Sequence, residues 1–429
     1  MNAFFEKVKA VLRDPMIRRR VIFTLVALAL FQLLASIPIP GIDRARLASF
    51  FAQNEFLGLL NVFSGGGLSN LSIVMLGVSP FITASIIMNL LTMMSPKLKE
   101  MYQEEGEAGR KKFSQYSRIA TVPLALISAF GFILLLEKQG VVPALSLLAL
   151  ITNVMIIVGG TMILIWIGEL ITEFGIGNGV SLIIFAGIVS RIPRVLSERI
   201  ISFNQADLPL YIFLLAFAVF IIYMVVFVTE AERPVPVTYA KRVRGNKVYG
   251  GVSTYLPLRI TQAGVIPIIF ALSILLFPQL ILNALSKLTL QGAFGSFVSS
   301  GSQFLLNALH DKLIYGISYF ILVFLFTFFY TAVTFDPDSI SKNLQQNGAF
   351  ISGVRPGEAT SAYLGKIILR ITFTGALFLG VIAILPLIIQ GLLPQVGSIA
   401  IGGTALLIVV SVILDLIKKI DAQISMREY

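Results

Sequence analysis

Residues 61–80 read NVFSGGGLSNLSIVMLGVSP, and an apolar sequence continues from there to residue 94. Each glycine of the run 65–67 costs about 1 kcal/mol relative to alanine in a helix, so the run cannot propagate a stable helix. The stretch therefore predicts a short half-helix and turn over 56–70, followed by a membrane span over 71–94. Composition leaves two interpretations of 56–70 open: an external loop with an interfacial helix, or a mobile element that enters a cavity with its glycines as hinge.

The composition of the whole chain is that of a polytopic membrane protein. Of its 429 residues, 56% are hydrophobic and only 13% are charged, whereas a soluble domain carries about 25% charged residues. A hydrocarbon core ~30 Å thick is crossed by about 20 mostly apolar residues in a helix. We therefore predict an all-α fold with ten transmembrane helices, over 21–37, 71–94, 119–136, 150–171, 179–197, 208–229, 262–282, 313–335, 367–390 and 397–417.

The basic residues indicate how these spans are oriented. When loops are assigned alternately to the two sides, one side carries 25 of the 33 lysines and arginines, and both termini lie on it. Cytoplasmic loops carry the excess of basic residues. The charge pattern therefore predicts that both termini are cytoplasmic.

Ten spans divide into two sets of five, which predicts two domains over 1–200 and 201–429. An odd number of spans in each half forces related halves into opposite orientations. Such inverted repeats place a central pathway at the interface between the halves. No repeat is visible in the sequence itself, so this prediction rests on the number of spans.

Ionisable side chains are scarce within the spans, although ion-coupled transport usually depends on them. Glu169 and Glu173, at the cytoplasmic end of the fourth span, are interpreted as headgroup-level residues that also pack between helices. The chain has no cysteine, and its one histidine, His310, is interpreted as a solvated loop residue. We therefore predict no catalytic residues, no metal site and no cofactor. An ion-coupled secondary transporter of small solutes remains the alternative to a passive pathway.

Two aliphatic pairs at helical spacing are candidates for a pore lining. Val78 and Ile82 flank Pro80, and Ile184 and Ile188 lie in the fifth span. Such pairs are ordinarily packing or lipid-facing residues, but a ring of aliphatic side chains closes a pore to ions by excluding water.

The cytoplasmic loops 230–261 and 336–366 are long, polar and basic. The first contains the cluster Lys241, Arg242, Arg244 and Lys247, and the second contains Arg355 at a predicted turn. Basic loops hold topology and contact anionic lipid. Loops of this length also tend to bind a partner. A phosphate-rich partner such as ribosomal RNA, or a large cytosolic protein, suits their charge.

At these residues the chain closely resembles the SecY/Sec61-alpha family, whose bacterial members form the pore of the protein translocase. The matching stretches run in order along nearly the whole chain: 38–41, 61–92, 105–112, 166–187, 239–242, 256–259, 263–267, 348–350, 355–358 and 402–404. The resemblance implies two five-helix halves that form a clamshell hinged at the outer loop between the fifth and sixth spans. The lateral gate would open between the second and third spans and the seventh and eighth.

The resemblance also implies roles for particular residues. A re-entrant plug half-helix near 57–70 would fill the outer funnel; its residues include Phe63, Ser64, Gly65, Gly66, Gly67, Leu68, Ser69 and Asn70. By motif position, the pore ring would comprise Val78, Ile82, Ile184, Ile188, Ile269 and Ile408. The docking surface for the motor ATPase SecA or the ribosome would comprise Lys241, Arg242, Arg244, Lys247, Arg259 and Arg355.

The implied function is a passive channel for unfolded secretory polypeptides that releases apolar segments sideways into lipid. Implied partners are the small subunits SecE and SecG, SecA, the ribosome, signal sequences with their nascent chains, and anionic lipid, all at the bacterial inner membrane. An aliphatic ring suits this function because it offers no hydrogen bonds that would hold a passing chain. A ribosome receptor without a pore would use the same basic loops, and it stays open as a third reading.

Overall fold

A computed structural model describes most of the chain. The described residues are 13–40, 67–68, 70–103, 105–138, 140, 142–143, 145–193, 197, 201, 208–239, 242–244, 247–249, 253–262, 264–285, 300–301, 303, 311–392 and 403–428. Contacts group the chain into two compact units. Unit 1 comprises Met1–Leu210, Leu272–Tyr315 and Ile408–Tyr429, and unit 2 comprises Tyr211–Ala271 and Gly316–Leu407. The predicted halves 1–200 and 201–429 stay a prediction.

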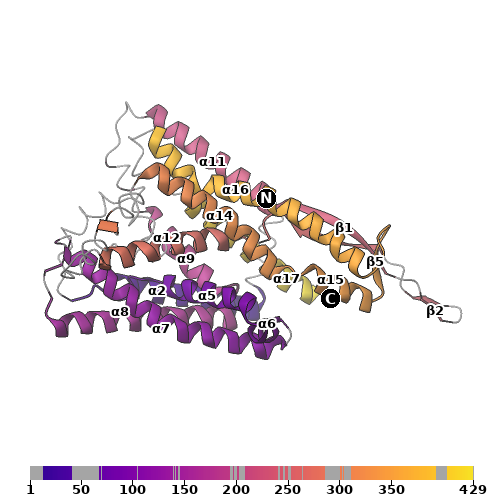
Figure 1. The fold of residues 1–429 in the computed structure, drawn as a ribbon, viewed down its shortest axis with the longest axis horizontal. Coiled ribbons are helices and arrows are strands. Elements are labelled where there is room, and N and C mark those ends of the chain that lie inside the picture. Colours follow the sequence, from indigo (N-terminus) through magenta and orange to yellow (C-terminus); the bar gives the residue numbers. More distant parts are fainter. Residues whose placement is uncertain are drawn as a thin grey trace. The chain divides into compact units, whose positions relative to one another are not determined.

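Every predicted span contains a helix (Figure 1). These helices are α2 (Pro15–Ser36), α5 (Ser79–Met94), α7 (Gly106–Lys138), α8 (Leu147–Phe174), α9 (Gly179–Val189), α11 (Leu208–Glu230), α12 (Ile266–Leu285), α14 (Lys312–Thr334), α16 (Glu358–Leu392) and α17 (Gly403–Glu428). Within the described residues, six helices are long and apolar enough to cross a membrane: α2, α7, α8, α11, α14 and α16. The chain is therefore a helical multi-pass membrane protein, and the count of ten full spans stays a prediction.

Polar residues directly before the first helical residue fix where several helices begin. Each accepts a hydrogen bond from a backbone N–H of the first turn, which otherwise has no partner. The side-chain oxygen accepts from a backbone N–H in each case: Asp14 from Met16 at 2.8 Å, Ser146 from Ala149 at 3.3 Å, Asn178 from Ser181 at 3.2 Å and Asp336 from Asp338 at 3.0 Å.

Two predicted spans are shorter as helices than the sequence suggested. Residues 71–78 form consecutive turns, and α5 begins only at Ser79. Leu71 and Gly77 have φ values of 42° and 58°, which a helix cannot contain. The irregular part of the second span therefore extends to Val78, not to residue 70. In the fifth span, α9 ends at Val189 rather than at 197, and its 11 residues are too few to cross the hydrocarbon alone.

The core of unit 1 forms where the turns of 71–78 meet the long helices. α5 packs on α7, α7 on α8, α8 on α9, and α2 on both α8 and α9. The buried cluster contains Ile39, Leu68, Leu71, Met75, Ala125, Ala129, Phe132, Ile133, Leu136, Val142, Val154, Ile157 and Val158. Residues N-terminal to α5 are thus an integral part of this core.

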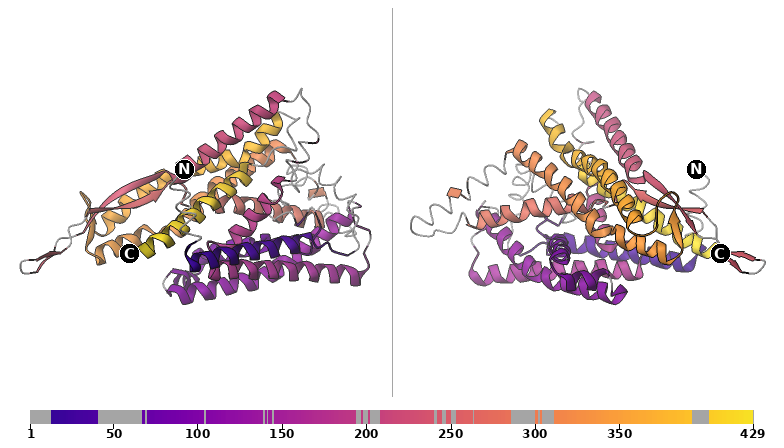
Figure 2. Two further views of the ribbon diagram at one scale, coloured as in Figure 1. Left: turned by 180° about the vertical axis from the view of Figure 1, so that it is seen from behind. Right: turned by 45° about the vertical axis from the view of Figure 1, so that its right-hand side comes forward.

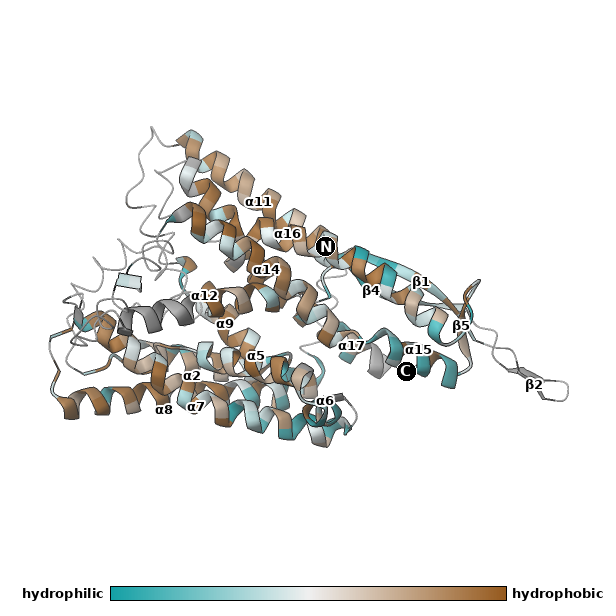
Figure 3. Cartoon of the chain, viewed as in Figure 1, coloured by the Kyte–Doolittle hydropathy of each residue, from teal (hydrophilic) through white to brown (hydrophobic). Residues whose placement is uncertain are grey.

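The two long polar loops of unit 2, 230–261 and 336–366, meet in one small antiparallel sheet, with strand order β4-β1-β5. β1 (Glu232–Tyr239) and β4 (Ser253–Arg259) come from the first loop, and β5 (Ala349–Ile351) comes from the second. β1 pairs Val237 with Thr254 on one side and with Ile351 on the other. Figure 3 shows hydrophilic colour on β1, β4 and α15 (Pro337–Gln346), against mostly hydrophobic α11 and α14.

The prolines of β1 lie where the strand can accept them. Proline cannot donate a ladder hydrogen bond, so within sheets it is confined to edges. Pro234 and Pro236 pair only with β4, because β5 pairs with β1 from Val237 onward. β1 is therefore an edge strand over its first half and a central strand over its second.

Buried residues of the sheet pack on α16 and α15. The cluster contains Val235, Val237, Leu258, Ala349, Ile351, Leu364, Ile367 and Ile368. Further along unit 2, α14 and α16 lie side by side in all views (Figure 2), with the rings of Phe324 and Phe373 in edge contact at 5.8 Å. The sheet thus packs directly on the helix α16.

Candidate functional site

The first aliphatic pair lies at the start of α5. Val78 caps the helix, and its carbonyl accepts a hydrogen bond from the Ile82 N–H at 3.1 Å. Val78 is fully buried, and Ile82 is 7% exposed. The predicted pair is therefore placed by the junction between the irregular segment 71–78 and the helix.

The second pair lies on α9, where both Ile184 and Ile188 are buried. α9 is fixed closely to α8, because a Cβ added at Gly179 would overlap the carbonyl oxygen of Gly168. In addition, the Thr172 hydroxyl oxygen accepts a hydrogen bond from the Gly179 N–H at 2.9 Å. The pair therefore lies on the short helix α9, whose first residue packs tightly against the long helix α8.

The remaining ring candidates lie on other helices. Ile408, on α17, is 2% exposed and belongs to unit 1, whereas Ile269, on α12, is partly exposed and belongs to unit 2. All six ring candidates are described, and all six are aliphatic. They can exclude water, but they offer no side-chain hydrogen bond.

The C-terminal end of the predicted plug is firmly attached to unit 1. Leu68 is buried in the core cluster, and the Asn70 side-chain amide donates to the carbonyl of Ala35 at 3.3 Å. Gly67 is also described and buried. Phe63, Ser64, Gly65, Gly66 and Ser69 lie outside the described residues.

The Glu169 carboxylate forms an ion pair with the Arg118 guanidinium, which joins α8 to α7. The prediction of a headgroup-level residue that packs between helices did not include this partner. Elsewhere in the described part of the chain, no group of three His, Cys, Asp or Glu side chains could hold a metal ion. The Arg118–Glu169 pair thus has a structural role, because it fastens two long helices to each other.

Replacing Glu169 with Gln should destabilise the protein only slightly. The side chains of Arg118 and Glu169 are 41% and 28% exposed, so water screens the pair and its loss should cost at most about 1 kcal/mol. Thermal unfolding in detergent measures this loss, which should shrink in high salt. Glu173→Gln is the matched control, since Glu173 lies one turn away without an ion pair to any described residue. Equal melting temperatures for the two variants in low salt would contradict the assignment.

The predicted docking residues are distributed over the sheet and its surroundings in unit 2. Arg259 ends β4 opposite Glu232, and it is exposed. β2 (Arg242–Arg244) and β3 (Lys247–Tyr249) form a hairpin that places Arg244 opposite Lys247. Lys241 lies outside the described residues. The hairpin lies at the far end of the β1 ribbon from α11 (Figure 1).

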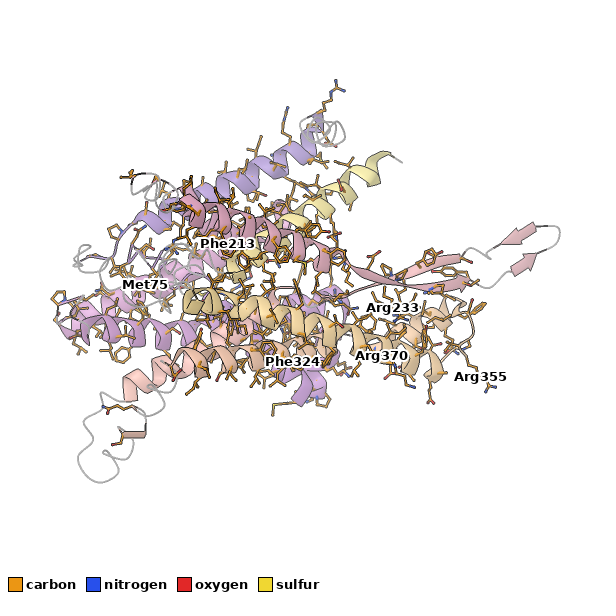
Figure 4. All side chains as sticks on the ribbon, turned by 90° about the horizontal axis from the view of Figure 1, so that it is seen from above. Met75, Phe213, Arg233, Phe324, Arg355 and Arg370 are labelled. Carbon is orange, nitrogen blue, oxygen red and sulfur yellow. The ribbon has the colours of Figure 1, made fainter. Side chains whose placement is uncertain are left out.

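Arg355 lies at a fixed turn, as predicted. Its carbonyl accepts from the Thr360 hydroxyl at 2.9 Å, and the Gly357 carbonyl accepts from the Ser341 hydroxyl at 2.7 Å. Gly357 has a φ of 100°, which favours glycine. The Arg355 side chain is exposed and points away from the sheet (Figure 4). A rigid turn thus presents a guanidinium group to solvent.

Comparison with known proteins identifies the family. The SecY family model matches residues 72–417, which include five β-strands and every helix from α5 to α16. The chain belongs to the SecY family. The match takes in all six ring candidates and the described docking residues.

SecY relatives match this chain over nearly its whole length. The protein translocase subunit SecY of Thermotoga maritima is 41% identical, covering 98% of this chain and 96% of its own. SecY of Halalkalibacterium halodurans is also 41% identical, over 99% of each chain. SecY of Pseudomonas aeruginosa is 40% identical over 96% of this chain and 91% of its own.

Solved structures share the fold. A structure described as that of a protein-conducting channel matches with a TM-score of 0.66 at 20% identity, covering 97% of this chain and 94% of its own. Sec61 in the canine ribosome-channel complex matches with a TM-score of 0.63 at 19% identity, with the same coverage. The SecY fold is therefore present along almost the entire chain.

Proposed function

We propose that this protein is the pore subunit of a bacterial protein translocase. It would pass unfolded secretory polypeptides across the membrane and release apolar segments laterally into lipid. The observation that carries the proposal is the match to relatives named protein translocase subunit SecY over nearly the full length of both chains. The same match favours this function over an ion-coupled transporter and over a ribosome receptor without a pore.

In the proposed mechanism, Val78, Ile82, Ile184, Ile188, Ile269 and Ile408 form the ring that closes the channel to ions. The described chemistry supports this role, because five of the six are buried aliphatic side chains. Aliphatic groups release a passing chain easily, since they make no hydrogen bonds to it. The segment near 57–70 would act as the plug, and of its described residues Gly67 and Leu68 are buried in unit 1.

Energy and selectivity in this mechanism come from partners and from lipid. The helices of a lateral gate would expose a passing segment to the bilayer, where Leu and Ile partition favourably and Lys and Asp do not. SecE and SecG would stabilise the pore, and SecA or a ribosome would drive the chain through it. The proposed location is the bacterial inner membrane with both termini in the cytoplasm, as the basic residues predict.

Reconstitution tests the function directly. Vesicles that contain this chain with SecE and SecG should protect a secretory precursor from added protease only when SecA and ATP are present. A transporter would instead show saturable uptake of a small solute coupled to an ion gradient. Precursor that stays accessible to protease, together with such uptake, would overturn the proposal.

Replacing Arg355 with Glu should weaken docking of SecA or the ribosome at least about tenfold, equivalent to roughly 1.4 kcal/mol. An exposed arginine on a fixed turn is suited to bidentate contact with carboxylate or phosphate, and Glu reverses its charge. Binding to the reconstituted complex measures the change. Lys342→Glu, with the same charge reversal on exposed α15 of the same loop, is the control. If the two variants bind SecA or the ribosome with equal affinity, Arg355 is not a specific docking contact.

A further inference from the structure

The segment 71–78 begins on a short antiparallel bridge to the chain that follows α2. The Ile39 N–H donates to the Leu71 carbonyl at 2.8 Å, and the Ile73 N–H donates to the Ile37 carbonyl at 3.0 Å. Between these hydrogen bonds, Pro38 and Ser72 face one another as a bridge pair. One side of the segment is therefore held by backbone hydrogen bonds.

The other side of the segment rests on a glycine of α8. A Cβ added at Gly160 would overlap the carbonyl oxygen of Ile73, and it would lie 2.8 Å from the Ile73 carbonyl carbon and 3.3 Å from Cγ1 of Val74. The overlapping atoms belong to the backbone, which cannot turn aside as a side chain can. Val74 is fully buried as well. Only glycine permits α8 to approach the segment this closely.

Consecutive tight turns connect this contact to the predicted pore ring. The Met75 N–H donates to the Ser72 carbonyl, and the Gly77 N–H donates to the Val74 carbonyl, each at 2.9 Å. The next residue is Val78, whose carbonyl begins the hydrogen bonding of α5. Met75 is 1% exposed and lies among the core side chains of unit 1 (Figure 4). Ile73 is therefore connected to Val78 by consecutive hydrogen-bonded turns.

We infer that Gly160 is a positioning residue for the closed pore. Because it has no side chain, the Ile73 carbonyl can pack against α8, and this contact fixes the position of Val78. The inference rests on the proposed function, because it assigns Val78 to the ring. Gly160 itself is not a ring residue. It acts through the backbone of 71–78, clamped between α8 and the chain after α2.

The test compares three alanine variants in a protein that carries Met75→Cys as its one cysteine. Gly160→Ala should raise the rate at which a membrane-permeant maleimide labels the thiol introduced at position 75 several-fold, and it should raise the resting ion conductance of reconstituted vesicles. Gly159→Ala is the matched control, since a Cβ there would meet no described atom within 4 Å. Gly109→Ala would overlap the Met101 carbonyl oxygen, so it creates a backbone clash remote from 71–78. Both controls should leave labelling and conductance at the parent values.

Each outcome decides the inference. It is supported if labelling and conductance rise together in Gly160→Ala alone, and it is overturned if either stays at the level of Gly159→Ala. If Gly160→Ala fails to accumulate in the membrane, Val74→Ala replaces it. That variant leaves α8 intact and removes the Val74 methyl group that lies 3.3 Å from a Cβ built at Gly160. It should therefore loosen the packing of the segment on α8, and unchanged labelling and conductance would also overturn the inference.

A parallel measurement on Ile408→Asn separates this inference from the proposed function. If Ile408→Asn leaks ions and Gly160→Ala does not, the positioning role is wrong and the ring stands. If Ile408→Asn does not leak, Ile408 is removed from the ring, whatever the maleimide labelling at position 75 shows.

Discussion

Replacing Ile408 with Asn is expected to give the channel a resting ion leak several-fold above that of the parent, and to let it accept precursors with defective signal sequences. Ile408 is 2% exposed and aliphatic. An amide at that position binds water through hydrogen bonds, and a narrow apolar constriction closes only while it excludes water. Conductance of vesicles that contain the purified complex measures the leak, and export of a precursor with a weakened signal measures selectivity.

The control for this substitution lies on the same helix. Ile413 is 41% exposed, so Ile413→Asn makes the same chemical change on α17 at an open surface. It should leave the vesicles as tight as those with the parent protein. Equal conductance of parent, Ile408→Asn and Ile413→Asn would remove Ile408 from the ring.

Replacing Val237 with Asp is expected to disrupt the β4-β1-β5 sheet and abolish partner docking. Val237 is 2% exposed and is paired on both sides, with Thr254 and Ile351. Burial of a carboxylate without a partner costs several kcal/mol, more than a three-stranded sheet can lose. The loops 230–261 and 336–366 should then both become sensitive to protease, because β1 is the strand that joins them.

The control substitution is Tyr255→Asp on the neighbouring strand β4, where Tyr255 is 67% exposed. It should leave the protease pattern unchanged. Limited proteolysis of the complex and binding of SecA or ribosomes give the two readouts. If Val237→Asp leaves residues 336–366 as resistant as in the parent, the joined sheet is not what orders them.

Long apolar stretches predicted the helices well, and their ends less well. α7 begins at Gly106 rather than near 119, and α16 begins at Glu358 rather than near 367. Both helices continue past the membrane with polar residues, which the search for apolar stretches cannot detect. Hydropathy marks where a helix is buried in lipid, and it leaves open how far that helix extends into water.

The sheet of unit 2 was missed because its pairing is not local. β1 and β5 are joined across more than a hundred residues, so no short window contains both strands. One signal was present, since Val235 and Val237 alternate with exposed neighbours, as in a strand with one buried face. The prolines beside them are disfavoured inside a sheet. The pattern became a strand because β5 pairs only beyond the prolines.

In the candidate site, too, local sequence patterns were predictable and contacts between separate segments were not. Its aliphatic pairs were visible as spacing, and their burial agrees with a role inside the protein. The close backbone contacts at Gly160 and Gly179 were not predicted, because a glycine in a helix does not reveal which backbone lies against it. The close approach at Gly160 is to Ile73, far away in the chain, and the one at Gly179 is to Gly168 in the preceding helix α8.

Site-specific crosslinking of a stalled secretory chain tests the proposed pathway most directly. Single cysteines would be placed in turn at Val78, Ile82, Ile184, Ile188, Ile269 and Ile408, and the chain has no native cysteine to interfere. We expect the stalled polypeptide to crosslink to all six positions and not to a cysteine at the exposed Ile413. Crosslinks absent from the six positions, with the precursor nevertheless translocated, would contradict a pathway through this ring.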